Sequence, residues 1–206
     1  MQRHLRPTLF FFWLLLLELL LPTGADAHMQ VKDSALYSGL RQPFGHWEGI
    51  IFLVVLSVWA GVAVRPHGGR WRSCLFLTAA GIASGVWIGI PSSSVISVAL
   101  LSATLLLGLL VAADRPGPGV LARLIAPAGG ILLGIFWREG LNLTPGVLLF
   151  FCAGITVCGT GLAAALMAMA ATLTGPVART GVRILASWAC AVSAMLLAYA
   201  YRSGQF

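Results

Sequence analysis

The sequence predicts an all-α integral membrane protein, a bundle of six transmembrane helices that follows a cleaved signal peptide. Hydrophobic residues make up 59% of the 206 residues and charged residues only 9%, a composition that no soluble domain of this length requires. The apolar residues form long uninterrupted runs and do not alternate with polar ones. This pattern favours helices over the strands of a membrane barrel.

Residues 1–27 have the three parts of a signal peptide. Two arginines precede an apolar core over residues 8–21, and residues 25–27 form an A-x-A cleavage site. Cleavage there would leave His28 as the first residue of the mature chain. The alternative interpretation is an uncleaved first membrane helix.

Six apolar segments follow, most of them close to the roughly 20 residues that span a bilayer. They cover residues 48–64, 73–90, 95–113, 120–137, 146–173 and 184–201. We therefore expect a short extracytoplasmic segment over 28–47, a transmembrane domain over 48–201 and a tail over 202–206.

Arginines gather in alternate loops and predict the orientation. The loop over 65–72 carries three of them, the region 114–123 carries two, and the predicted loop around 179–183 carries two, whereas the opposite loops are nearly neutral. Positive loops stay in the cytoplasm, so both mature termini are expected outside it. We predict a multi-pass protein of the bacterial inner membrane, in contact with the lipid bilayer. The net charge of +7 has no basic cluster interleaved with aromatics, so nucleic-acid binding is not expected.

Glycines recur every four residues in two of the segments, a spacing that lets helix backbones approach closely. They are Gly81, Gly85 and Gly89 in the second segment, and Gly130 and Gly134 in the fourth. The fourth segment also contains Pro127 and Gly129, which predicts a bend or break there. Such a break can expose backbone carbonyls to an ion, or it can be a kink that neighbouring helices fill.

The ionisable residues His46 and Glu48 lie where the polar segment gives way to the first apolar run. A carboxylate at this depth is costly unless a partner, water or an ion meets it. Two interpretations are open: the helix dipole stabilises Glu48, or the carboxylate and the imidazole bind a divalent metal. His28, with its free amine after cleavage, is a further metal ligand candidate. No catalytic motif is present, and we do not expect an enzyme.

The stretch QPFGHWEG at residues 42–49, followed by IIFLVVLSVWA, resembles the start of the first membrane helix in the HupE/UreJ family of hydrogenase and urease accessory proteins. The family pattern is H-P-L-x-G-x-D-H with an apolar run that ends near L-W-A. Pro43 matches, Glu48 stands at the family's Asp, and Gln42 and Gly49 replace its two histidines.

The family's second motif, F-H-G-x-A-H-G, falls on residues 136–142, where Phe136 is retained and both histidines are absent. Cys158 lies about where the family often has another histidine. The resemblance implies a membrane accessory protein, including nickel permeases, in which His46 and Glu48 receive a transient divalent ion and Glu139 and Cys158 line its path. No permanently bound cofactor is expected. The alternative is a non-transporting scaffold that has lost these ligands and binds a membrane protein partner or further copies of itself.

Overall fold

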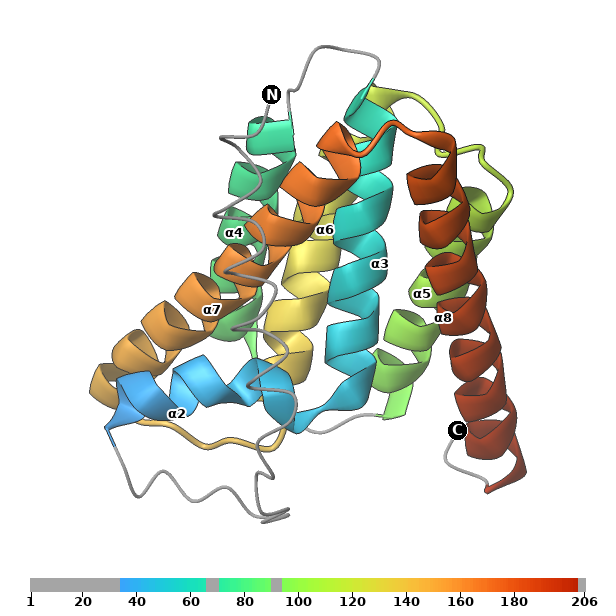
Figure 1. Cartoon of the computed structure of the whole chain (residues 1–206). Coiled ribbons are helices and arrows are strands. Elements are labelled where there is room, and N and C mark those ends of the chain that lie inside the picture. The colour runs from blue at the N-terminus through green and yellow to red at the C-terminus, as the bar shows by residue number, and fades with distance from the viewer. Residues whose placement is uncertain (1–33, 66–70, 90–93, 204–206) are drawn as a thin grey trace. The chain divides into compact units, whose positions relative to one another are not determined.

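The computed structural model describes residues 34–65, 71–89 and 94–203. The predicted signal peptide, its cleavage site and His28 lie outside these ranges. The described elements are α2 (Ala35–Arg41), a short 3-10 helix η1 (Gln42–Gly45), α3 (Trp47–Val64), α4 (Trp71–Ile88), α5 (Ser94–Ala112), α6 (Gly119–Arg138), α7 (Pro145–Thr172) and α8 (Pro176–Arg202) (Figure 1). The helices α3 to α8 are long and apolar enough to cross a membrane, as predicted.

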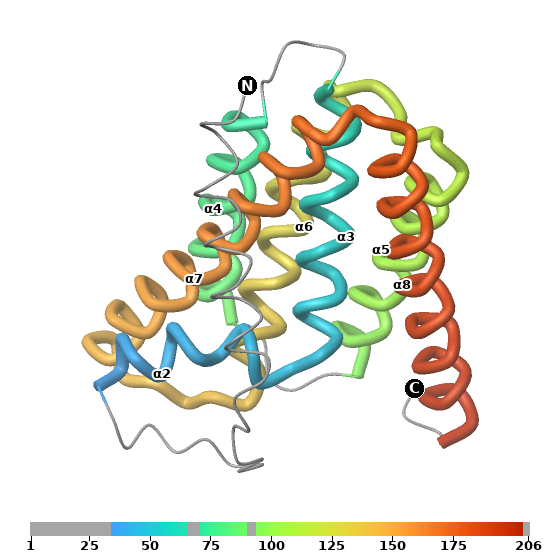
Figure 2. Tube along the Cα trace, viewed as in Figure 1, coloured from blue at the N-terminus to red at the C-terminus, as the bar shows by residue number. Residues whose placement is uncertain are grey.

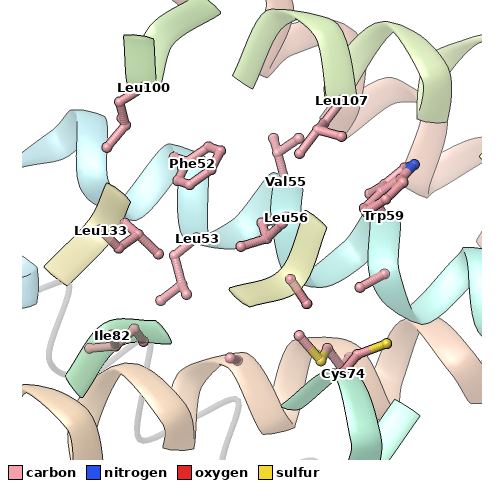
Figure 3. Packing of buried hydrophobic residues seen from close by; sticks show 14 of the residues in the cluster. Phe52, Leu53, Val55, Leu56, Trp59, Cys74, Ile82, Leu100, Leu107 and Leu133 are labelled. Atoms are coloured by element: carbon pink, nitrogen blue, oxygen red, sulfur yellow. The ribbon is translucent and has the colours of Figure 1, made fainter. Parts of the chain in front are cut away.

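Helix α3 is the central element, with α5, α6 and α7 packed around it (Figure 2). Residues buried by neighbours make up 72% of its apolar window, against 22% for α8. Phe52, Leu56 and Trp59 of α3 are almost fully buried, and they lie among leucines of α5 and α6 (Figure 3). A helix that is apolar on all sides can be enclosed in this way without burying a charge.

The contact between α4 and α6 is built on glycines of both helices. A Cβ atom at Gly81 would overlap the backbone at Pro127 and Gly130, and one at Gly134 would overlap the backbone at Ile82. In the same way, Gly85 of α4 faces the backbone of α6, and Gly130 of α6 faces the backbone of α4. The two backbones are therefore in direct contact along this line, the geometry that small residues permit in membrane helices.

Gly89 faces a side chain of α6 and not its backbone. It follows the end of α4 with a positive φ of 42°, and the guanidinium of Arg138 lies against it. Arg138 donates hydrogen bonds to the carbonyls of Val86 (2.7 Å) and Trp87 (2.9 Å). These carbonyls are in the last turn of α4, where no intrahelical donor is available.

Of the predicted bend or break in the fourth span, the break is absent, because α6 is one continuous helix through Pro127. The segment around Pro127 and Gly129 is packed against neighbouring helices. The carbonyl of Pro127 faces Gly81, and a Cβ at Gly129 would lie 2.7 Å from the side chain of Leu56. Neighbouring helices thus fill the space beside the proline, the second of the two alternatives left open by the sequence.

The last helix begins earlier than predicted. Residues expected in a loop, Arg179 and Arg183, lie in the first two turns of α8. Arg179 forms an ion pair with Asp114 at 2.5 Å, and the Nε of Arg183 donates to the carbonyl of Ala112 at the end of α5 (2.8 Å). Arginine is a good helix former, so a polar first turn continues the helix once these partners are available.

The polar segment before α3 contains a helix, α2, that the sequence analysis did not predict. The hydroxyl of Ser34 accepts a hydrogen bond from the backbone N–H of Tyr37 and caps α2. Helix α2 packs on α7, and the contact is again a pair of glycines. A Cβ at Gly39 would overlap the carbonyl of Phe151, and one at Gly154 would overlap the backbone of α2.

Candidate functional site

The candidate site lies where η1, the start of α3 and the end of α6 meet. The side chain of Gln42 is buried, and its Nε2 donates a hydrogen bond to the carbonyl of Trp137 at 2.8 Å. That carbonyl is in the last turn of α6 and has no intrahelical partner. Gln42 therefore joins η1 to α6.

The indole of Trp137 is fully buried between α3 and α7. Its Nε1 would lie 2.6 Å from a Cβ at Gly49, and its Cζ3 would lie 3.0 Å from a Cβ at Gly159. The Nε1 has no hydrogen-bond partner within the described ranges. The two glycines thus form the walls of the space that this ring occupies, and a side chain at either position would displace it.

His46 is exposed at the N-cap of α3 and makes no capping hydrogen bond through its side chain. Its ring meets Phe136 edge to face, with 5.5 Å between centroids. Glu48 is half-buried in the first turn of α3. Among the residues that the structure describes, its carboxylate forms no salt bridge. The positive end of the α3 dipole is the nearby stabilising influence.

Glu139 follows the last residue of α6, and its backbone N–H donates to the carbonyl of Phe136. Cys158 is half-buried on α7. It lies 13 residues beyond Pro145, the first residue of α7, which places it about 20 Å along the helix. Over the described part of the chain, no three His, Cys, Asp or Glu residues gather closely enough to hold a metal ion.

Three positions at which the sequence differs from the HupE/UreJ pattern lie close together in the structure. Gln42 donates to the backbone carbonyl of Trp137, and the indole of Trp137 packs beside Gly49, so Trp137 contacts both residues across helices. Along the chain, these three positions appeared unrelated to one another. The signal that could have linked Gly49 and Trp137 is their size, because a glycine on one helix leaves the space that a bulky indole on another helix can fill.

Comparisons with protein-family models, curated proteins and solved structures found no match for this chain. The resemblance to the HupE/UreJ family therefore stays a prediction from residues 42–60 and 136–142.

Proposed function

We propose that this protein is a non-transporting membrane scaffold that binds a partner protein. The observation that carries the proposal is the buried indole of Trp137 between Gly49 and Gly159. In the permease hypothesis the ion moves from Glu48 toward Cys158, and the buried indole lies beside Gly49, the neighbour of Glu48, and beside Gly159, the neighbour of Cys158. A divalent ion in a membrane needs water or polar ligands along its way, whereas this space is filled by the rings of Trp137 and Phe136.

The partner surface that we assign is the start of α3. Trp47 is 66% exposed there, between the exposed His46 and the half-buried Glu48. A rigid, exposed aromatic group flanked by polar side chains is typical of the residues that dominate protein interfaces. The 3-10 helix η1 directly precedes α3. The hydrogen bond from Gln42 in η1 to α6 holds this surface in place.

The proposal is tested by nickel uptake and photo-crosslinking in the same cells. Uptake of isotopic nickel is expected to be equal with and without the protein. A photo-crosslinking residue in place of Trp47 is expected to give one adduct of defined mass. The matched control is the same residue in place of Leu106, which is similarly exposed (64%) but lies within α5; no discrete adduct is expected there. Loss of uptake on deletion, or equal adducts at both positions, would contradict the scaffold.

A nickel permease is the second candidate, and one observation favours it. The edge-to-face contact brings His46 of α3 to Phe136, three residues before Glu139 at the end of α6. Imidazole and carboxylate together suit a borderline ion such as nickel. For a permease, Glu48→Gln should abolish uptake while the amount of folded protein stays unchanged. Unchanged uptake in that variant would end the ion-site hypothesis.

A further inference from the structure

A groove runs between α3 and α8 toward the arginine-rich end of the helices. Its apolar part has a volume of about 60 Å³. The α3 wall consists of Val54, Val55 and Val58, and the α8 wall includes Leu185 and Ala186. A second, smaller cavity of about 10 Å³ shares Val111 and Val182 with it. Because the two cavities share these valines, we treat them as one groove with an apolar length and a polar mouth.

The groove exists because α8 packs mainly on α5 and only lightly on α3. Valine side chains on α3 and the small Ala186 on α8 do not fill the space between the two helices. Leu185 is 57% exposed, so the groove opens to the surface of the protein. In a bilayer, the molecules that reach an apolar surface groove between membrane helices are lipids, whose acyl chains match its chemistry.

Three arginines and one carboxylate surround the mouth: Arg65, Arg179, Arg183 and Asp114. Three positive charges against one negative charge leave an excess of two positive charges. Arg179 is 53% exposed even though it pairs with Asp114. The mouth therefore attracts an anion that approaches from the membrane surface.

The arginines of the mouth carry more N–H donors than their hydrogen bonds in the described part of the chain use. A guanidinium carries five N–H groups. The Nη2 of Arg65 donates to the carbonyl of Ala170 (2.6 Å), and the Nε of Arg183 donates to that of Ala112. The Nε of Arg65 is buried and has no partner within the described part of the chain. Planar guanidinium groups suit a phosphate.

We propose that this groove binds one anionic phospholipid. Its phosphate accepts hydrogen bonds from the arginines of the mouth, and one acyl chain lies along the valines of α3. A zwitterionic lipid brings its own cation to a mouth that already has an excess of positive charge, so it binds less tightly. Free phosphate leaves the apolar length of the groove empty. This inference is independent of the scaffold proposal, since it concerns other residues.

The test uses the full chain in a neutral detergent, titrated with phosphatidylglycerol or with phosphatidylcholine of the same acyl chains. Native mass spectrometry counts the bound lipids, and the melting temperature reports their effect. One phosphatidylglycerol is expected to bind at least about tenfold more tightly than phosphatidylcholine, as two or more charge contacts imply. Equal affinity for the two lipids would overturn the proposal.

Two variants separate the headgroup from the acyl chain. Arg179→Gln removes a mouth charge that caps no helix, and it is expected to weaken phosphatidylglycerol binding about fivefold. Ala186→Leu keeps every charge and fills the apolar length, and it is expected to weaken binding of the same lipid. The matched control is Arg72→Gln, an exposed arginine on the first turn of α4 whose guanidinium lies over Trp71; its binding should be unchanged.

Further outcomes would overturn the proposal. If inorganic phosphate raises the melting temperature as much as phosphatidylglycerol does, the mouth is an anion site and not a lipid site. If Ala186→Leu binds the lipid normally, no acyl chain lies in the groove. If Arg72→Gln weakens binding as much as Arg179→Gln, the attraction belongs to the whole basic surface and not to this mouth.

Discussion

The α4–α6 contact and the α3–α8 contact both use small side chains, with opposite results. Between α4 and α6, glycines on both helices face each other's backbones, and the helices touch. Between α3 and α8, valines face an alanine, and a groove remains. The difference is the Cβ atom: a glycine on each helix lets the backbones meet, whereas branched valines hold them apart without filling the gap. Small residues alone therefore do not predict close packing.

The largest effect is expected from breaking the close contact. Gly134→Leu would place a bulky side chain against the backbone of α4 at Ile82, so the two helices would have to separate. We expect a loss of about 3 kcal/mol or more of stability, seen as little monodisperse protein in size-exclusion chromatography. Gly161→Leu is the matched control, because a Cβ there has no neighbour within 4 Å; it should behave as the wild type. Equal losses in both variants would contradict the glycine contact.

A smaller effect is expected where a glycine faces a side chain and not a backbone. Gly49→Ala would bring its Cβ within 2.6 Å of the Trp137 Nε1 and should cost about 1–3 kcal/mol, measured as a lower melting temperature. Combining it with Trp137→Phe, which removes the overlapping indole nitrogen, should recover part of that loss. If the double variant instead shows the sum of the two single losses, the two residues do not compete for this space.

The smallest effect is expected on the loosely packed side. Ala186→Leu adds apolar atoms to a groove that has room for them, so the melting temperature in lipid-free detergent should change little, by the equivalent of about 1 kcal/mol or less. A loss as large as that of Gly134→Leu would mean that α3 and α8 are already in close contact, and the comparison between the two sides would fail.

Much of the fold was predictable, because each membrane helix satisfies its own backbone hydrogen bonds and is therefore set by local hydropathy. The six spans and most of their bounds follow from the apolar runs. The start of α8 was missed, since the first turns contain Arg179 and Arg183, whose partners lie on and just beyond α5. Helix α2 was missed for a similar reason: its packing depends on Gly154 of α7.

At the candidate site, sequence alone located His46 and Glu48 at the start of a membrane helix and marked Gln42 and Gly49 as departures from the family pattern. The tertiary structure decided what those departures do. Gln42 meets the carbonyl of Trp137 across 95 positions of the chain, and the indole fills the space beside Gly49. The hydropathy of a segment depends only on its own residues, so the sequence is enough to locate the membrane spans. Hydrogen bonds and ring packing join residues from different helices, and so only the folded chain brings their partners together.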